Sequence, residues 1–218
     1  MKIQIKKEFV INRDSYFLEI CTNKNVLHIG ACDSPFTYSK IINNDLLHKK
    51  INDVSKKCIG IDIDNDAINI CKDHGINNIK NSPIEDIHGQ FNPDIIIFGE
   101  TIEHVLDIKN IVASIAKVMN KNTILLVSTP NAYSFLNFIN CIRGHENNHP
   151  DHVLSFTPYT LLNFFKNMGL KQVEPTIFTF LNNHLYGGLL TKIHVSLSKI
   201  FPMLSSTLVC KFVLQKND

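Results

Sequence analysis

VLHIGACDSP, residues 26–35, is an apolar run that passes directly into a turn of small residues. The run from Val26 to Ile29 has the character of a strand that is buried on both faces. A turn that begins with Gly30 allows the backbone to approach a ligand at the carboxyl end of such a strand. One glycine is a modest signal by itself, so the interpretation depends on the rest of the chain.

Short apolar runs alternate with longer segments of helical period. The clearest helix covers 107–120, where apolar residues recur at intervals of three and four. A second helix is signalled by Thr157 and Pro158 at its start and by Gly169 at its end. The expected strands are 26–29, 58–61, a short one near Ile79, 94–98, 124–127, 172–180 and 207–214, and a further helix is expected over 184–199. This alternation is typical of an α/β fold with a parallel sheet and crossover helices.

A carboxylate follows the second expected strand. The stretch CIGID ends at Asp62, about thirty residues after the turn at Gly30. A carboxylate in this position can accept hydrogen bonds from both hydroxyls of a ribose. The alternative is a solvated strand end without a ligand. Asp64 or Asn65 is better explained as the cap of the next helix.

Composition limits the classes of protein to consider. The chain has 218 residues, 44% of them hydrophobic, which is enough for one substantial core, and we expect a single domain over 1–218. Its 22 basic and 20 acidic residues nearly balance, so no strong field favours nucleic acid or an anionic membrane. The apolar runs are too short to span a bilayer, and the six cysteines include no CxxC pair. We therefore expect a cytoplasmic protein with free thiols and no membrane span.

A third stretch makes the pattern specific. PDIIIFGETIEHVLD, residues 93–107, reads as a buried strand that ends in a glycine and passes into a helix. Together with VLHIGACDSP, CIGIDIDNDAI, NTILLVSTPNAYS and HPDHVLSFTPYTLLNFFKNMGL, it resembles the class I, Rossmann-like S-adenosylmethionine-dependent methyltransferases, in particular their small-molecule branch of the methyltransferase type 11/12 kind. The resemblance covers residues 26–170. It implies a three-layer α/β/α sandwich around a mostly parallel, seven-stranded sheet with an antiparallel C-terminal strand.

The resemblance also implies roles for individual residues. S-adenosyl-L-methionine would lie across the strand ends, with its methionine portion at the first turn. The residues implied are His28, Gly30 and Ala31 at the methionine portion, Asp62 at the ribose, Ile63, Ile84 and Glu85 at the adenine, and Gly99 and Glu100 beneath the cofactor.

Departures from the family pattern keep other functions open. A histidine, His28, replaces an acidic residue, and Pro83 replaces the common adenine-binding aspartate. Cys32 and Ser34 stand where the first turn usually has glycines. A catalytically degenerate module that binds the cofactor without turnover is therefore one alternative, and an NAD-dependent oxidoreductase is another, although it would normally carry more glycines in this turn. Nucleic acid is disfavoured as acceptor, since the chain has no Asn-Pro-Pro-aromatic run and no basic stripe.

Histidines cluster in 145–152, a segment that we expect to cover the acceptor. Methyl transfer from a sulfonium requires alignment and exclusion of water, and only some acceptors need a base. The candidates for a general base are His149, His152 and, after the fourth strand, His104. A metal site is an alternative use of such histidines, but Pro150 interrupts the helix that an i, i+4 ligand pair requires, so no metal is expected. Local hydrogen bonds that fix the loop are a third explanation.

Three further segments are expected to shape the acceptor side. Residues 1–24 form an N-terminal helical cap region, while 140–156 and 183–206 form an acceptor-site loop and a lid. Apolar residues at helical spacing between Leu185 and Ile200 favour packing against the sheet edge, with a lid over a hydrophobic acceptor or a homodimer contact as alternatives. The acceptor is a small molecule that the sequence does not identify, and a glycan or natural-product intermediate follows only from the resemblance.

Overall fold

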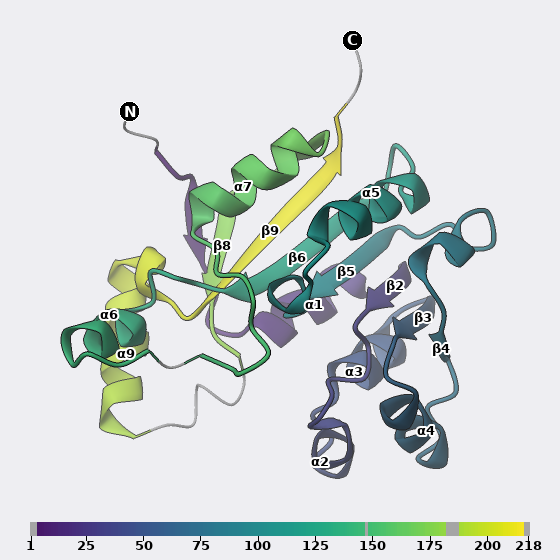
Figure 1. Ribbon diagram of the computed structural model, residues 1–218, viewed down its shortest axis with the longest axis horizontal. Coiled ribbons are helices and arrows are strands. Elements are labelled where there is room, and N and C mark those ends of the chain that lie inside the picture. Colours follow the sequence, from purple (N-terminus) through teal and green to yellow (C-terminus); the bar gives the residue numbers. More distant parts are fainter. Residues whose placement is uncertain (1–3, 147, 182–187, 216–218) are drawn as a thin grey trace.

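The computed structural model describes residues 4–146, 148–181 and 188–215, and its strands form one sheet (Figure 1). Five strands are parallel neighbours: β2 (Asn25–Ile29), β3 (Lys57–Asp62), β4 (Ile79–Asn81), β5 (Ile95–Gly99) and β6 (Ile124–Pro130). Most of their side chains are apolar and buried, as in a parallel sheet that is covered on both faces. The five strands expected in the first two thirds of the chain are confirmed.

The other edge of the sheet is antiparallel. β9 (Thr207–Leu214) pairs antiparallel with β6, and both β7 (Leu170–Gln172) and β8 (Thr176–Thr179) pair antiparallel with β9. β1 (Lys7–Phe9) completes this edge, parallel to β8. The strand order is β1-β8-β9-β6-β5-β2-β3-β4, with β7 beside β9. The antiparallel C-terminal strand is as expected, but the described residues form nine strands rather than seven.

Two short strands account for this difference. The single strand expected over 172–180 is divided into β7 and β8, because the chain between them contains Pro175, which has no N–H for a strand ladder. The N-terminal region 1–24 was expected to be helical, and it contains β1 as well as α1 (Arg13–Cys21). β1 forms because the edge of β8 offers unpaired backbone groups, which the sequence of the N-terminus does not reveal.

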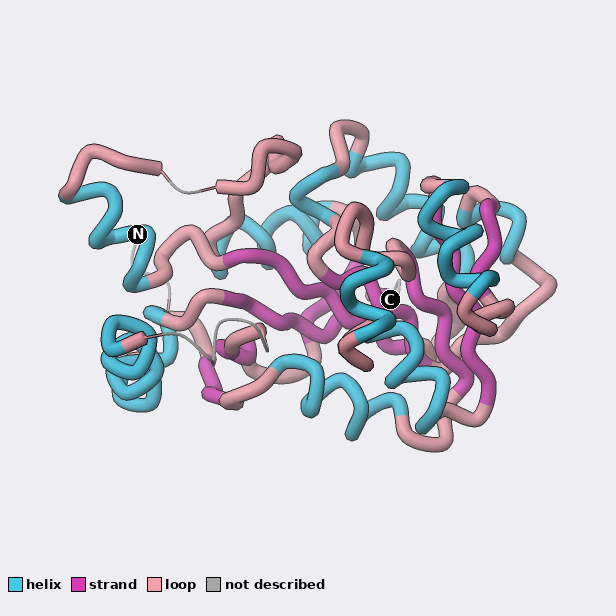
Figure 2. Tube along the Cα trace, turned by 90° about the horizontal axis from the view of Figure 1, so that it is seen from below, coloured by secondary structure: helices cyan, strands magenta, loops and turns pink. Residues whose placement is uncertain are grey.

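Helices cover both faces, so the molecule is a three-layer α/β/α sandwich (Figures 1 and 2). α5 (Ile108–Val118) and α7 (Pro158–Asn167) pack on one face through Ile115 and Phe165. α1 and α3 (Leu47–Val54) pack on the opposite face through Phe17 and Ile51. α2 (Thr37–Ile42) and α4 (Asn65–Asp73) contact each other beside β4.

The two best-signalled helices begin where their caps predict. The Asp107 carboxylate accepts the N–H of Asn110 at the start of α5, and Thr157 forms a capping box with Thr160 at the start of α7, with Pro158 in the first turn. Of the helix expected over 184–199, residues 184–187 lie outside the described residues, Gly188 is the N-cap of α9 (Leu189–Ile200), and residues 189–199 belong to that helix. α9 and α6 (Phe135–Ile142) lie near each other at one end of the molecule (Figure 1).

Every helix in the described ranges is too short or too polar to be a membrane span. All six cysteines are free thiols, and all except Cys141 are buried.

Candidate functional site

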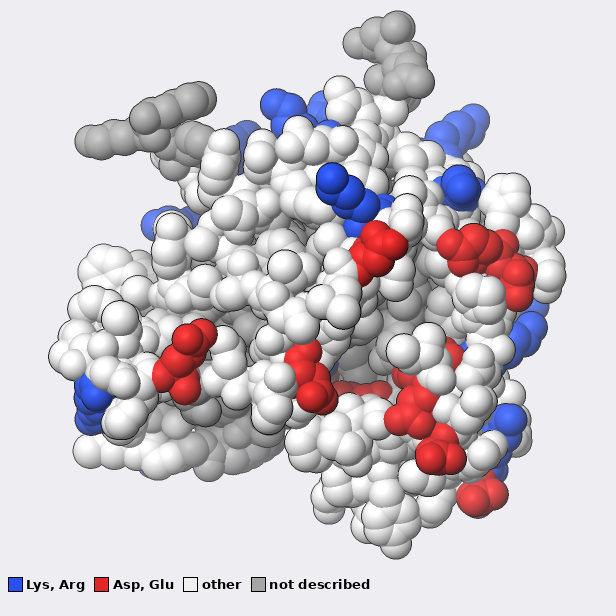
Figure 3. Space-filling model, in the orientation of Figure 1, with Lys and Arg blue, Asp and Glu red and all other residues white. Residues whose placement is uncertain are grey.

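The carboxyl ends of β2, β3 and β5 lie side by side in the middle of the sheet. β3 borders β2 on one side and β5 borders it on the other. The chain crosses from β2 to β3 in one direction, and it later crosses back from β4 to β5 in the opposite direction. Open α/β sheets bind ligands at the carboxyl ends of strands beside such a switch point. In Figure 3 the surface is hollowed near these strand ends, and Asp and Glu side chains lie around the hollow.

Asp62 connects the end of β3 to the turn after β2. Its Oδ2 accepts the N–H of Cys32 at 2.8 Å, and its Oδ1 accepts the N–H of Asp64 at 3.1 Å. The carboxylate therefore faces the first turn, which is where a ribose would lie, and its contact with a ribose stays a prediction. Asp64 caps α4 through the N–H groups of Asp66 and Ala67, as expected.

The first turn is held by close backbone packing. Gly30 has a φ of 72°, and a Cβ at this position would lie 2.4 Å from Thr101 Oγ1. The N–H groups of Gly30 and Ala31 both donate to the carbonyl of Ile61, at 2.9 and 3.2 Å. The side chain of Ala31 is buried, so this residue can meet a ligand only through its backbone. The ends of β2 and β3 are thus joined by hydrogen bonds, and Thr101, which follows β5, packs against the same turn.

Glu100 follows Gly99 at the end of β5 in an uncommon conformation. Its φ is 49°, which is rare for a residue with a side chain and concentrates at functional sites. Its N–H donates to the carbonyl of Ser128 at 2.9 Å, and its carboxylate lies 3.7 Å from Nη1 of Arg13 on α1. Burial raises the pKa of Glu100, although Arg13 opposes the shift. Within the described chain, Glu100 Oε1 is buried without a hydrogen-bond partner.

The three residues predicted at the adenine lie in different environments. Ile63, next to Asp62, exposes 91% of its surface although it is apolar, so a flat apolar ring can cover it. Ile84 is buried in the core, and the carboxylate of Glu85 accepts the hydroxyl of Ser114 on α5. Only the backbone of Ile84 remains for a ligand, and the side chain of Glu85 already has a partner. The adenine contacts of these residues stay predictions.

The prediction for His28 is corrected by its burial. The ring is 3% exposed and stacks on His48, with the two Nδ1 atoms 3.3 Å apart. Burial, together with the neighbouring His48 and Arg13, holds the pKa of His28 well below its usual range. Burial also lowers the pKa of His48 to about 4. The ring therefore belongs to the core beneath the first turn and does not face the methionine portion.

This pair predicts a pH-dependent stability. Because both folded-state pKa values are lowered, the unfolded chain binds more protons below pH 6.5, and the free energy of unfolding falls as the pH drops from about 6.5 toward 4. We expect the free energy of unfolding of His48→Gln to depend less steeply on pH over this window, by up to about 1.4 kcal/mol per pH unit, than that of the wild type. Urea unfolding at several pH values measures the free energy of unfolding of both proteins. The contributions of other titratable groups cancel in the difference between the variant and the wild type.

The same substitution at the exposed His88 is the matched control, and it should keep the wild-type dependence. Equal slopes for His48→Gln and the wild type would contradict the assignment.

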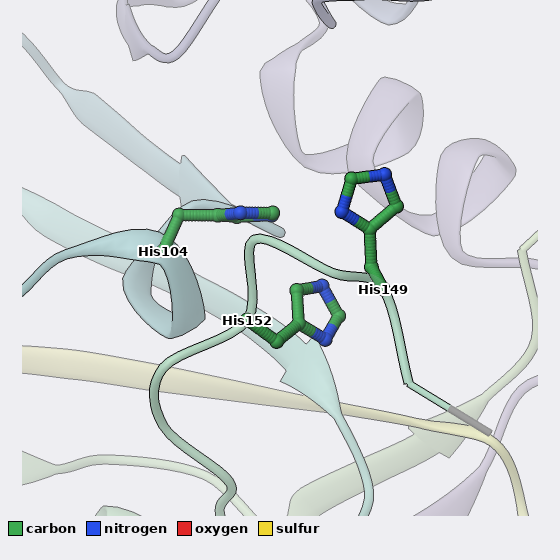
Figure 4. A group of neighbouring side chains, drawn as sticks. All are labelled: His104, His149 and His152. Carbon is green, nitrogen blue, oxygen red and sulfur yellow. The ribbon is translucent and has the colours of Figure 1, made fainter.

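The three histidines predicted as bases lie together (Figure 4). His104 ends the short helix η2 (Ile102–His104) after β5, whereas His149 and His152 lie in the loop after α6. One nitrogen from each ring lies within 4.8 Å of the others. Burial and the neighbouring histidines lower the pKa values of His104 and His152, so these rings favour the neutral form.

The loop that carries two of these histidines is tied to the third through Glu103. The Glu103 carbonyl accepts the N–H groups of Val153 and Leu154 at 2.9 and 3.1 Å. Its carboxylate is almost completely buried, accepts the hydroxyl of Thr129 at 3.1 Å and lies 3.9 Å from His152 Nε2. Burial and the nearby Glu100 raise the pKa of Glu103 to about 8. Glu103 was not predicted from the sequence, because an acidic residue near a helix start is common without a function.

Comparison with known proteins identifies the family. Residues 5–174 match a sequence model described as a methyltransferase domain. The chain belongs to this methyltransferase family. It is therefore an enzyme, and its methyl donor is S-adenosylmethionine. The dehydrogenase alternative is wrong. No curated protein sequence matches the methyltransferase significantly.

Solved structures agree with the methyltransferase in fold. A SAM-dependent methyltransferase from Archaeoglobus fulgidus is 18% identical, with 91% of this chain and 90% of that chain covered and a TM-score of 0.55. The N-methyltransferase NodS from Bradyrhizobium japonicum, in complex with S-adenosyl-L-homocysteine, is 16% identical, with coverages of 94% and 86% and a TM-score of 0.56. A putative S-adenosylmethionine-dependent methyltransferase from Listeria monocytogenes is 12% identical, with coverages of 93% and 97% and a TM-score of 0.57.

The residues at the strand ends of the methyltransferase fit its cofactor in three respects. Ile63 offers an exposed apolar surface next to Asp62, whose carboxylate faces the first turn. Gly30 lets the backbone approach closely where a Cβ would collide with Thr101. Oε1 of Glu100 is buried near Arg13 without a hydrogen bond, so it is an acceptor that an amino group can satisfy.

Two residues of the methyltransferase site had no signal in the sequence. Arg13 is buried on α1, where its guanidinium contacts Asp14 and lies near Glu100. Thr101 packs over Gly30 and donates to the carbonyl of Gly99 at 3.0 Å. Both residues contact residues that are far away in the chain, so local sequence patterns cannot reveal them.

Proposed function

We propose that this enzyme transfers the methyl group of S-adenosylmethionine to an oxygen, nitrogen or carbon atom of a small-molecule acceptor. The observation that carries the proposal is the convergence of three strand ends, in which Asp62 bonds to the turn after β2 while Thr101 packs over Gly30. Ile63 is exposed next to Asp62, and the three histidines lie together in the segments that follow β5 and α6. Glycan and natural-product intermediates are the first acceptors to test.

Each side of the site has its own task in this proposal. Asp62 accepts the ribose hydroxyls, the backbone at Gly30 and Ala31 lies against the methionine portion, and Glu100 accepts the amino group. S-adenosylmethionine supplies an activated methyl group with a good leaving group. The protein aligns the acceptor for in-line displacement and keeps water out.

The acceptor side is formed by the loop after α6 and by η2. His104, His149 and His152 lie there, and the lowered pKa values of His104 and His152 favour neutral rings. One of the three histidines takes the proton of an acceptor that must lose it. α9 exposes Leu189 and Leu190 and serves as a lid for an apolar acceptor or as a homodimer contact. A cytoplasmic location and a single domain also stay predictions.

Calorimetry and a turnover assay test the proposal. The purified protein is titrated with S-adenosylhomocysteine and then incubated with S-adenosylmethionine and pools of small hydroxyl- and amine-bearing compounds, while formation of S-adenosylhomocysteine is followed. We expect one site per chain and turnover in at least one pool. Binding without turnover in any pool would favour the degenerate module, and absence of binding at millimolar ligand would refute the nucleoside site.

A further inference from the structure

The three clustered histidines meet the requirements of a metal site, although the sequence predicted none. That prediction considered ligands on one helix, which Pro150 would interrupt. In the structure, His104 of η2 lies beside His149 and His152 (Figure 4). These two belong to the loop after α6, so α5, β6 and α6 separate them from η2 along the chain. Pro150 lies between His149 and His152 in an irregular turn, and the two rings still approach each other.

We propose that His104, His149 and His152 bind one divalent transition-metal ion, preferentially Zn²⁺. Their ligand nitrogens lie within 4.8 Å of one another, and the ring centroids are 4.6 to 5.8 Å apart. Tetrahedral Zn²⁺ with Zn–N bonds of about 2.0–2.1 Å requires ligand nitrogens roughly 3.3 Å apart. Binding of one ion therefore requires the ligand nitrogens to move closer together by up to about 1.5 Å.

The surroundings of the rings supply what an ion needs beyond its ligands. The Glu103 carboxylate lies 3.9 Å from His152 Nε2, and the Asp151 carboxylate lies 3.7 Å from His149 Nδ1. Carboxyl groups next to metal-binding histidines orient the rings and fix the nitrogen that each ring offers to the ion. The two backbone hydrogen bonds from 153 and 154 to the Glu103 carbonyl fix the loop against η2. This arrangement places the ligands before an ion arrives, which lowers the cost of binding.

The number of ligands indicates what the ion does. Three protein ligands leave a tetrahedral ion with one open position, which is the pattern of catalytic zinc sites rather than of closed structural ones. Imidazole ligands suit Zn²⁺, Co²⁺ and Ni²⁺ better than Mg²⁺ or Ca²⁺. In combination with the proposed function, the open position would hold an oxygen or nitrogen of the methyl acceptor. A ligand nitrogen cannot accept a proton, so the ion and a general base are different uses of these rings.

Metal titration of the untagged protein tests the site without any acceptor. After treatment with a chelator and its removal, the protein is titrated with Zn²⁺ by calorimetry and with Co²⁺ by visible absorption. We expect one ion per chain, a tetrahedral Co²⁺ spectrum and displacement of Co²⁺ by Zn²⁺. Substitution of His104, His149 or His152 by Ala should each weaken Zn²⁺ binding by about 10- to 100-fold or more.

His145→Ala is the matched control, because His145 is an exposed histidine of the same loop outside the cluster. It should keep the wild-type affinity, and thermal unfolding of the apo proteins checks that each variant folds. The proposal is overturned if the wild type binds no Zn²⁺ at 100-micromolar concentrations (roughly the weakest affinity that we would accept for such a site), or if the triple Ala variant keeps the Co²⁺ spectrum. A separate titration with S-adenosylhomocysteine tests the nucleoside site. Failure of the metal proposal can therefore be distinguished from failure of the proposed function.

Discussion

Asp62→Asn should weaken binding of S-adenosylhomocysteine by at least about tenfold, and Asp62→Ala should weaken it further. A carboxylate that accepts both ribose hydroxyls contributes about 1.5–3 kcal/mol per charged hydrogen bond, and about 1.4 kcal/mol corresponds to a factor of ten in affinity. Asn keeps one oxygen for the N–H of Cys32, which Asp62 accepts at 2.8 Å, so the first turn retains its anchor. Calorimetric titration of the two variants and the wild type measures the effect.

Asp66→Asn is the matched control for this experiment. Asp66 is an exposed carboxylate in the first turn of α4, a few residues from Asp62, and its substitution removes the same charge without touching the turn after β2. The affinity of this variant should stay within about twofold of the wild type. If all three variants bind as the wild type does, the ribose does not lie at Asp62.

Gly30→Ala should lower the free energy of unfolding by about 2–4 kcal/mol. Two costs add at this position. A side chain at a φ of 72° costs about 1 kcal/mol, and the new Cβ would lie 2.4 Å from Thr101 Oγ1, well inside van der Waals contact. Urea unfolding measures the change, and the affinity for S-adenosylhomocysteine should fall as the first turn moves.

Two further variants separate the backbone cost from the collision. Gly75 has a φ of 80°, and a Cβ at this position would meet no atom within 4 Å, so Gly75→Ala should cost only about 1 kcal/mol. In the double variant Gly30→Ala with Thr101→Ala, the colliding hydroxyl is gone, and the loss should be smaller than the sum of the single variants by about 1 kcal/mol. Strict additivity would show that Thr101 does not pack over the turn.

Much of the sheet could be predicted because its signals are local. An apolar run of four or five residues is buried wherever helices cover both faces, and the caps at Asp107 and Thr157 act within one helical turn. Asp62 was predicted for the same reason, since its position at a strand end and its spacing from the first turn are visible in the chain. The strand count was wrong because β1 forms by pairing with the distant edge of β8 and because Pro175 divides the expected strand 172–180 into β7 and β8.

The candidate site was only partly predictable, and His28 shows why. Its place before the first turn suggested a ligand contact, but alternation along β2 directs its ring to the face of α3, where His48 covers it. Ile84 and Glu85 likewise follow the short strand that we expected near Ile79. In the structure, however, the side chain of Ile84 packs in the core and the carboxylate of Glu85 accepts a hydrogen bond from Ser114 on α5. Side-chain direction depends on neighbouring elements that spacing does not describe.

The sequence alone predicted the class of fold, the methyltransferase family and the carboxylate at the end of β3, because these depend on residues that are close together in the chain. Only the tertiary structure decided that Arg13 approaches Glu100 and that His104 joins His149 and His152. These contacts arise where the parallel crossovers bring separate strand ends and their loops to one edge of the sheet. A linear pattern carries no record of that convergence, because the burial of the whole sheet determines it.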